Sequence, residues 1–280
     1  MPAIRLETKR VEKPWGRLDL WPGFGDVEDG GKPVGEIWFE APDGSDPELL
    51  VKYLFTSDKL SIQVHPDDAA AQARGYARGK DESWVVLAAE PHATIGLGLL
   101  DVMTHDELRA AALDGSIEDR MDWKAVKAGD FFYTPAGTIH AIGPGLTVIE
   151  TQQNVDLTYR LYDYGSDREL HLDDGIAVSN PVPYVATHIP NEVSPGRLLL
   201  AEGPKFVLER WSRAGSAPLV TGGQPVWLVP MSGGGTIDGA PLEAGGVWLV
   251  DSDVPLALED GIDMIVAYAG GTMIEAPWAG

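Results

Sequence analysis

The chain has 280 residues, of which 43 are acidic and 21 are basic, so its formal net charge is −22 at pH 7. Such an acidic surface repels the phosphate backbone of nucleic acids and anionic lipid headgroups, which excludes both as general partners. The chain contains no cysteine, so disulfides and thiolate metal sites are excluded and any metal must bind through nitrogen and oxygen atoms.

The N-terminal segment MPAIRLETKRVEKPWG has no uninterrupted apolar run of the kind that a secretory signal needs, so we expect a cytoplasmic protein. All basic residues and all six histidines lie between Arg5 and Arg213, whereas residues 214–280 contain acids and no base. A site that binds an anion, or that coordinates a metal through imidazole, must therefore be assembled from residues 1–213. The base-free tail is expected to be structural.

Short apolar segments recur along the chain, separated by many of its 33 glycines and 21 prolines. The clearest segments are, in order, GEIWFEA, LLVKYLF, LSIQV, SWVVLAA, ATIGLGL, DFFYTP and LTVIETQ. Short strands between regularly spaced turns predict an all-β barrel or sandwich. Two segments break the pattern and are predicted to be helices. These are residues 67–78 (DDAAAQARGYAR), which begin with acids, and residues 104–113, where Thr104 and Glu107 have capping-box spacing.

A proline-spaced segment at residues 180–195 is the predicted boundary between two units. Residues 1–180 would form a metal-binding β-barrel with helical insertions, and residues 181–280 would form a smaller β domain. Strands are again expected after the boundary, within LLLAEGPKFVLERW and GGVWLVDSDVPLALEDG. No convincing sequence repeat relates the two units, which leaves open whether they share an architecture.

The segment GDFFYTPAGTIH, residues 129–140, has the spacing of a strand, a tight turn and a returning strand. Pro135 cannot continue a strand ladder, Gly137 permits the turn, and His140 begins the next strand with its side chain on one face. The pattern resembles the second signature of the cupin superfamily, whose small β-barrels hold a metal in the barrel mouth.

Two further motifs supply metal donors. In SIQVHPDD, Gln63 and His65 project to the same side of a strand, because alternate side chains share a face. In GKDESW, Glu82 stands just before an apolar strand. Together with His140, these residues give two imidazoles, one carboxylate and one amide oxygen, a set that suits Zn²⁺ and leaves positions open to water or substrate.

A single histidine at the end of a strand is more often structural than a ligand, so the metal prediction rests on the joint appearance of QxHPD and PxGxxH. The remaining histidines lack such neighbours and are expected to be exposed or structural. They are His92, His105, His171 and His188.

Several ordered motifs resemble those of the type I phosphomannose isomerases, specifically the short bacterial form. They are QVHPDD, GKDESW, PAGTIHAIGPG and VIETQQNVDLTYRLYDYG, with KPWG and GEIW as further landmarks, and they span about residues 10–180. The resemblance implies a cupin-type jelly roll and the interconversion of mannose 6-phosphate and fructose 6-phosphate through a cis-enediol. It also implies one Zn²⁺ per chain, held by the four residues that the spacing selects.

Such an isomerisation needs a base that moves a proton between C1 and C2, and an electrophile that stabilises the enediolate oxygen. The resemblance makes Arg160 an active-site guanidinium. It also places Lys52 and Lys80 at family positions beside the metal, where they would anchor phosphate or shuttle a proton. Glu150, ten residues after His140 across a Gly-Pro-Gly turn, is a candidate base or a hydrogen-bond partner of the substrate or of a ligand.

Three more residues are candidates for substrate binding. Ser61 shares the strand face of the predicted ligands and would donate to phosphate. Arg168 follows LYDYG after a loop that is shorter than in relatives of the family it resembles. It would take over part of the anion binding that an extra basic residue in their longer loop provides. Asp156 would orient a sugar hydroxyl or Arg160. The alternative for Arg160 is a structural ion pair with Asp156 or Asp163.

Two other functions fit parts of the sequence. A different cupin enzyme, an iron oxygenase, would prefer two histidines and a carboxylate, and Gln63 argues against it. A catalytically silent sugar-phosphate-binding cupin would have no evident need for the convergent charges of Lys52, Lys80 and Arg160. We therefore expect a zinc isomerase that acts on a small sugar phosphate. It would be a monomer or a weak homodimer, without nucleic-acid or membrane partners.

Overall fold

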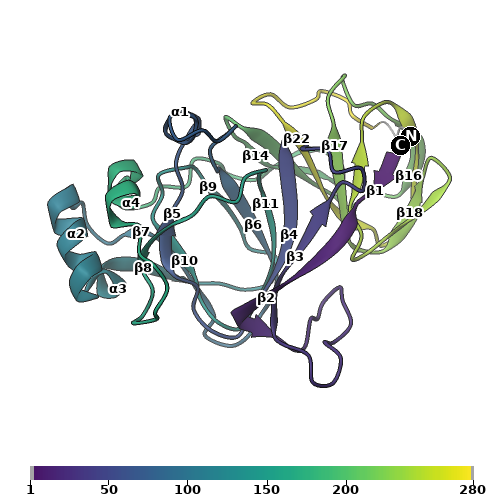
Figure 1. Ribbon diagram of the computed structural model, residues 1–280. Helices are drawn as coiled ribbons and strands as arrows, with labels where there is room; N and C mark the ends of the chain where they lie inside the picture. The colour runs from purple at the N-terminus through teal and green to yellow at the C-terminus, as the bar shows by residue number, and fades with distance from the viewer. Residues whose placement is uncertain (1–2, 279–280) are drawn as a thin grey trace.

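Two pairs of β-sheets make up residues 3–278, the part of the chain that the computed structural model describes. The first lobe contains a six-stranded sheet, a five-stranded sheet and the helices, and the second lobe contains a seven-stranded and a four-stranded sheet. Figure 1 shows the helices at one end of the molecule and the second lobe, in green and yellow, at the other. The predicted mainly β fold with helical insertions and further C-terminal β structure is confirmed, and the first lobe has the double-sheet arrangement of a jelly roll.

The first lobe is built from residues 7–178. Its six-stranded sheet has the order β2 (Glu7–Arg17), β3 (Val34–Glu40), β4 (Leu49–Thr56), β11 (Leu146–Gln153), β6 (Glu82–Ala89), β9 (Phe131–Thr134). Its five-stranded sheet has the order β12 (Tyr159–Tyr162), β5 (Ile62–Val64), β10 (His140–Ile142), β7 (Thr94–Leu99), β8 (Met121–Ala125). Its helices are α1 (Asp68–Gln72), α2 (His105–Asp114), α3 (Ile117–Arg120) and α4 (Leu172–Val178).

The second lobe adds two sheets. The seven-stranded sheet has the order β1 (Ala3–Arg5), β20 (Trp248–Val250), β17 (Val226–Ser232), β22 (Asp263–Ala269), β15 (Phe206–Trp211), β14 (Arg197–Glu202), β13 (Asn191–Ser194). The four-stranded sheet has the order β16 (Gly215–Leu219), β21 (Val254–Leu258), β18 (Gly234–Ile237), β19 (Ala240–Glu243). Within the described residues, no helix is long and apolar enough to cross a membrane.

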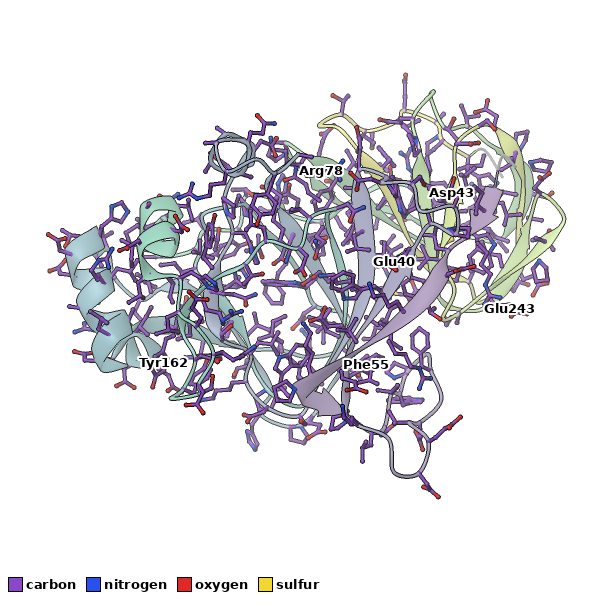
Figure 2. The ribbon with its side chains drawn as sticks, in the orientation of Figure 1. Glu40, Asp43, Phe55, Arg78, Tyr162 and Glu243 are labelled. Carbon is purple, nitrogen blue, oxygen red and sulfur yellow. The ribbon has the colours of Figure 1, made fainter. Side chains whose placement is uncertain are left out.

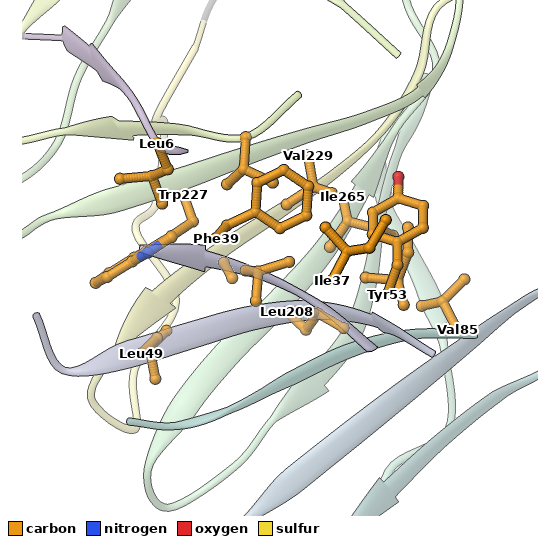
Figure 3. Close-up of a cluster of buried hydrophobic side chains, with 14 of the residues drawn as sticks. Leu6, Ile37, Phe39, Leu49, Tyr53, Val85, Leu208, Trp227, Val229 and Ile265 are labelled. Atoms are coloured by element: carbon orange, nitrogen blue, oxygen red, sulfur yellow. The ribbon is translucent and has the colours of Figure 1, made fainter. Parts of the chain in front are cut away.

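The six-stranded sheet lies between the five-stranded sheet and the second lobe, so its central strands are buried on both faces. Every residue of β4 is buried. Val51 and Tyr53 pack into the core that this sheet shares with the second lobe, whereas the alternate residues Lys52 and Leu54 face the interior of the first lobe. Figure 3 shows this shared core, where Tyr53 and its neighbours meet Trp227 and other side chains of the second lobe.

The five-stranded sheet uses the same alternation in the opposite sense. Ile62 and Val64 of β5 pack outward, in a cluster with side chains of α2 and α4, so the helices cover this face. The alternate residues, Ser61 and Gln63, line a cavity inside the lobe. The period of two along each strand therefore sends polar side chains from both sheets into one space.

Strand β1 pairs with β20 and thus belongs to the second lobe, although it precedes every strand of the first. Figure 1 accordingly shows the two ends of the chain close together in that lobe. The first lobe is therefore enclosed in sequence between two parts of the second. That residues 1–180 and 181–280 act as separate units stays a prediction.

Each of the seven strands predicted from the apolar segments is present, as β3, β4, β5, β6, β7, β9 and β11. The helix predicted from Thr104 is also confirmed, and both hydrogen bonds of its capping box are formed. The helix predicted over residues 67–78 is wrong beyond Gln72, because the chain turns at Gly75, which has φ +86°. Arg78, labelled in Figure 2, is held away from a helical path by hydrogen bonds to Asp46.

Asp68 of α1 connects the two lobes. Its Oδ2 lies 2.5 Å from Lys205 Nζ, and its Oδ1 accepts hydrogen bonds from Gly79 N at 2.8 Å and Gln153 Nε2 at 2.9 Å. Burial raises the pKa of Asp68, but the hydrogen bonds from Lys205, Gly79 and Gln153 outweigh burial and lower this pKa to about 2. The carboxylate therefore contributes stability above its ordinary pKa of 3.8, and this contribution is lost as the pH falls through about 2.

We predict that, as the pH is lowered from about 4 to about 2, the free energy of unfolding falls less steeply in Asp68→Asn than in the parent protein. The difference in slope should stay below the ~1.4 kcal/mol per pH unit of a full one-proton difference, because a third of the side chain is exposed. Urea unfolding of the variant and the parent over this pH range measures both slopes. Parallel curves would contradict the prediction.

Candidate active site

One row of side chains on the five-stranded sheet is set by strand register. Gln63 of β5 is paired with His140 of β10 on one side and with Arg160 of β12 on the other. Directly paired residues on neighbouring strands project to the same face, so the three side chains lie next to one another. The register thus brings together a guanidinium, an amide and an imidazole from three separate sequence motifs.

A second row lies on the six-stranded sheet. Lys52 of β4 is paired with Trp38 of β3 and with Glu150 of β11, and Glu150 is paired in turn with Trp84 of β6. The ring centroid of Trp84 lies 5.1 Å from that of His140, so the two rows face each other across the first lobe.

His65, Glu82 and His140 form a buried group whose potential metal-ligating atoms all lie within 4.8 Å of one another. Glu82 Oε2 is 3.3 Å from His65 Nε2 and 3.4 Å from His140 Nε2. Among the described residues, neither His65 Nε2 nor Glu82 Oε2 has a hydrogen-bond partner. Three predicted metal ligands therefore converge, and two of their ligating atoms are buried without a partner.

The protonation states of these residues suit a cation. His65 Nδ1 lies 2.9 Å from the carbonyl oxygen of Leu157, and His140 Nδ1 lies 2.9 Å from that of Thr138. Each Nδ1–H donates to its carbonyl in the neutral tautomer, which leaves the Nε2 lone pair directed at Glu82. Burial lowers the pKa of both imidazoles, that of His140 to about 3.

Glu82 is held as a carboxylate. Burial raises its pKa, but the positive charge of Lys80 opposes burial and helps hold the pKa well below its usual range. Its Oε1 accepts a hydrogen bond from Lys80 Nζ, so Oε2 remains for another partner. A carboxylate oxygen that faces two imidazole lone pairs requires a cation between them, and the donor set fits a divalent transition metal.

Gln63, the fourth predicted ligand, lies beside this group. Its Nε2 is 3.3 Å from His140 Nε2, while its Oε1 accepts a hydrogen bond from Ser61 Oγ at 3.1 Å. A half-turn of the amide about its last side-chain bond would exchange these two atoms and direct the oxygen at the metal group. Gln63 as a ligand stays a prediction.

A cavity of about 210 Å³ adjoins the metal group. Every residue predicted to act in catalysis or substrate binding lines it, together with Gln63. They are Lys52, Ser61, Lys80, Glu150, Asp156, Arg160 and Arg168. With Lys13, five basic side chains line the cavity against the three acidic side chains of Glu36, Glu150 and Asp156. The cavity thus carries an excess of positive charge within a chain of net charge −22.

The acidic residues hold the ammonium groups in place. Lys52 Nζ lies 3.5 Å from Glu150 Oε1, 3.8 Å from Glu36 Oε2 and 4.5 Å from the ring centroid of Trp38. Glu150 Oε2 accepts a hydrogen bond from Trp84 Nε1 at 2.9 Å. Burial, and then the charge of Glu82, raise the pKa of Glu150. A buried carboxylate with a raised pKa has the property that a general base needs.

Arg160 and Arg168 are held differently. Arg160 Nε donates to the carbonyl oxygen of Glu169 at 2.9 Å, and within the described part of the chain neither Asp156 nor Asp163 accepts from this guanidinium. Asp163 instead accepts from Arg168 Nε at 2.7 Å and from Arg168 Nη2 at 2.5 Å. The structural ion pair considered for Arg160 is therefore made by Arg168.

Sequence reasoning gave no role to Lys13, Trp15 or Glu36, all of which line the cavity. Lys13 Nζ is 3.1 Å from Glu36 Oε1, and the charges of Lys52 and Lys13 overcome the effect of burial and lower the pKa of Glu36. The signal was present, because Lys13 and Trp15 belong to KPWG and Glu36 belongs to GEIW. Both motifs are landmarks of the family resemblance.

No protein-family model matches the chain. An alignment over 233 residues with the mannose-6-phosphate isomerase ManA of Bacillus subtilis, at 34% identity, covers 76% of this chain and 74% of that protein. The chain belongs to the mannose-6-phosphate isomerase family. A family member from Streptococcus mutans is 38% identical over 180 residues, an alignment that spans 56% of the S. mutans protein and 61% of this chain.

Solved structures of the mannose-6-phosphate isomerase family have the same fold. The B. subtilis mannose 6-phosphate isomerase superposes with a TM-score of 0.80 over 95% of this chain and 99% of that one, at 28% identity. The apo phosphomannose isomerase of Salmonella typhimurium, at 14% identity and a TM-score of 0.72, shares the fold. Two histidines and a carboxylate also suit non-haem iron oxygenases, but the family relationship favours an isomerase.

Proposed function

We propose that this protein is a metal-dependent mannose-6-phosphate isomerase that interconverts mannose 6-phosphate and fructose 6-phosphate. One observation carries the proposal: a cavity with an excess of basic side chains directly adjoins the buried group of His65, Glu82 and His140. The relatives in Bacillus subtilis and Streptococcus mutans bear the name of this activity.

The proposed cofactor is one Zn²⁺ per chain, held by Gln63, His65, Glu82 and His140. The neutral imidazoles, the carboxylate and the absence of cysteine together favour this ion over softer or harder metals. When bound, Zn²⁺ supplies positive charge that stabilises negative charge developing on the sugar oxygens.

Glu150 is the proposed base that moves the proton between C1 and C2. It is buried, it lines the cavity, and burial, followed by the charge of Glu82, raises its pKa. Arg160, beside Gln63, would donate to the enediolate oxygen from its terminal nitrogens, since within its guanidinium only Nε donates to another described residue. Lys80, which contacts Glu82, would hold a sugar hydroxyl or relay a proton.

The phosphate is proposed to bind at Lys52, Ser61 and Arg168, which line one cavity. Arg168 would bind it while Asp163 fixes the orientation of its guanidinium. Asp156, which lines the same cavity, would accept from a sugar hydroxyl. We further propose a cytoplasmic monomer or weak homodimer, and sedimentation at several protein concentrations tests the assembly.

The deciding experiment gives fructose 6-phosphate to zinc-loaded protein in deuterated water. Mannose 6-phosphate that carries some solvent deuterium at C2 is the expected product. The base removes a proton from C1 to form the enediol, and part of that proton exchanges with solvent before the base returns it to C2. Unphosphorylated fructose and metal-stripped protein are the controls. Absence of turnover with Zn²⁺, Co²⁺ and Mn²⁺ alike would refute the proposal, and binding without isomerisation would indicate a silent sugar-phosphate-binding protein.

A further inference from the structure

We propose that Asp81 and Tyr133 are positioning residues through which the second lobe controls how tightly the first lobe retains its metal. Neither side chain belongs to the metal group or lines the cavity. The inference rests on the proposed metal site, and it does not depend on which sugar the enzyme isomerises.

The turn between β9 and β10 contacts all three segments that carry the metal group. Ala136 N donates to Oδ1 of Asp81 at 3.0 Å, and Asp81 directly precedes Glu82 in the chain. Gly137 N donates to the backbone oxygen of His65 at 2.8 Å. His140 Nδ1 donates to the backbone oxygen of Thr138 at 2.9 Å. A shift of this turn would therefore displace the segments of His65, Glu82 and His140 together.

Asp81 holds the turn at one end. Asp81 is buried, and its backbone makes two hydrogen bonds to Gln153. Asp81 N donates to Gln153 Oε1 at 3.0 Å, and the Asp81 carbonyl oxygen accepts from Gln153 N at 3.1 Å. Its Oδ2 accepts a hydrogen bond from the Tyr133 hydroxyl at 2.8 Å. Asp81 thus joins the start of β6, β11, β9 and the turn in one hydrogen-bonded network.

Tyr133 extends this network to the second lobe. Its ring centroid lies 5.2 Å from that of Phe206 on β15. Gly203 leaves the space that the Tyr133 hydroxyl occupies, because a Cβ at position 203 would lie 2.3 Å from the Tyr133 hydroxyl oxygen and 2.4 Å from Cζ. A residue of the second lobe therefore determines where the hydroxyl that binds Asp81 can lie.

Removal of a group that orients the metal ligands through hydrogen bonds, without itself binding the metal, typically lowers metal affinity by 10- to 100-fold. Tyr133→Phe keeps the ring and deletes only the hydroxyl, so we expect the affinity for zinc to fall by about tenfold, the low end of this range. The matched control is Tyr268→Phe, which deletes a buried hydroxyl that donates to Glu209 within the second lobe. Tyr268→Phe loses two hydrogen bonds, because the Tyr268 hydroxyl also accepts from Ile274 N at 3.0 Å, but only Tyr133→Phe loses a bond to the network around the metal.

The experiment measures zinc affinity by competition with a chromogenic chelator, and the thermal midpoint of each metal-free protein. The expected result is weaker zinc binding by Tyr133→Phe than by Tyr268→Phe, while the metal-free midpoint of Tyr268→Phe falls at least as far as that of Tyr133→Phe. Equal zinc affinity in the two variants and the parent would overturn the inference. Failure of the parent itself to bind zinc would instead refute the proposed metal site.

Gly203→Ala provides a second test from the other lobe. The added methyl group must displace Tyr133, so zinc affinity should fall at least as much as in Tyr133→Phe. The matched control is Gly261→Ala followed by metal titration, because a Cβ at position 261 meets no atom within 4 Å, although its φ of +84° strains the backbone. Equal zinc affinity in Gly203→Ala and Gly261→Ala would overturn the coupling between the lobes.

Discussion

Replacing His140 by alanine should yield a folded protein that neither retains zinc nor isomerises its substrate. The imidazole is one of three buried donors of the metal group, and its removal leaves Glu82 and His65 with an incomplete site. Stabilisation of developing charge by a metal is worth several kcal/mol, so loss of the ion should lower kcat/KM by roughly 10³-fold or more. Metal analysis of the dialysed protein and the isomerase assay measure both effects.

His105→Ala is the control, because the His105 side chain is exposed and lies outside the metal group, with its Nε2 3.1 Å from the backbone oxygen of Ser179. This control should keep its zinc and its activity. An active His140→Ala variant with a full complement of metal would show that the ligand set is wrong. A variant that retains the metal but lacks activity would assign His140 to the substrate instead.

Replacing Arg160 by alanine should leave the zinc content unchanged and lower kcat by about 10²- to 10³-fold, as the removal of a donor to a developing oxyanion does. Arg160 lies beside Gln63 in the strand register and lines the cavity, yet it is not in the metal group. Steady-state kinetics with metal analysis on the same sample separate the two effects.

Arg160→Lys refines this prediction. It keeps the charge but loses the planar fork, so its kcat should lie between those of the alanine variant and the parent. Arg210→Ala removes a guanidinium that pairs with Asp263 in the second lobe, and it should leave kcat unchanged. Full activity of Arg160→Ala would exclude a catalytic role, and loss of zinc from it would indicate a structural one.

Much of the site was predictable because its residues are close in sequence or share a strand. Alternation along one strand places Ser61 and Gln63 on one face, and Pro135 and Gly137 locate the turn before His140. Pairing between strands was not predictable. Nothing in the local sequence specifies that Arg160 lies opposite Gln63, or that Lys52 lies opposite Glu150.

The supporting contacts were equally hidden. The tautomer of His65 is set by a hydrogen bond to the backbone oxygen of Leu157, far along the chain. Every residue has a backbone carbonyl, so the sequence does not indicate which one His65 contacts. The same holds for Arg168, whose partner Asp163 is evident only once the loop is folded. The prediction of a helix over residues 67–78 was too long, because it gave more weight to the alanines than to Gly75, where the chain turns.

The pairing of β1 with β20 has a consequence for dissecting this enzyme. No single cut of the chain can release either lobe intact. A fragment that ends at residue 180 would carry β1 without its neighbour. The complementary fragment would leave one edge of β20 bare, a template for pairing between molecules. A circular permutant that carries β1 after β22 would be the more faithful way to study the second lobe alone.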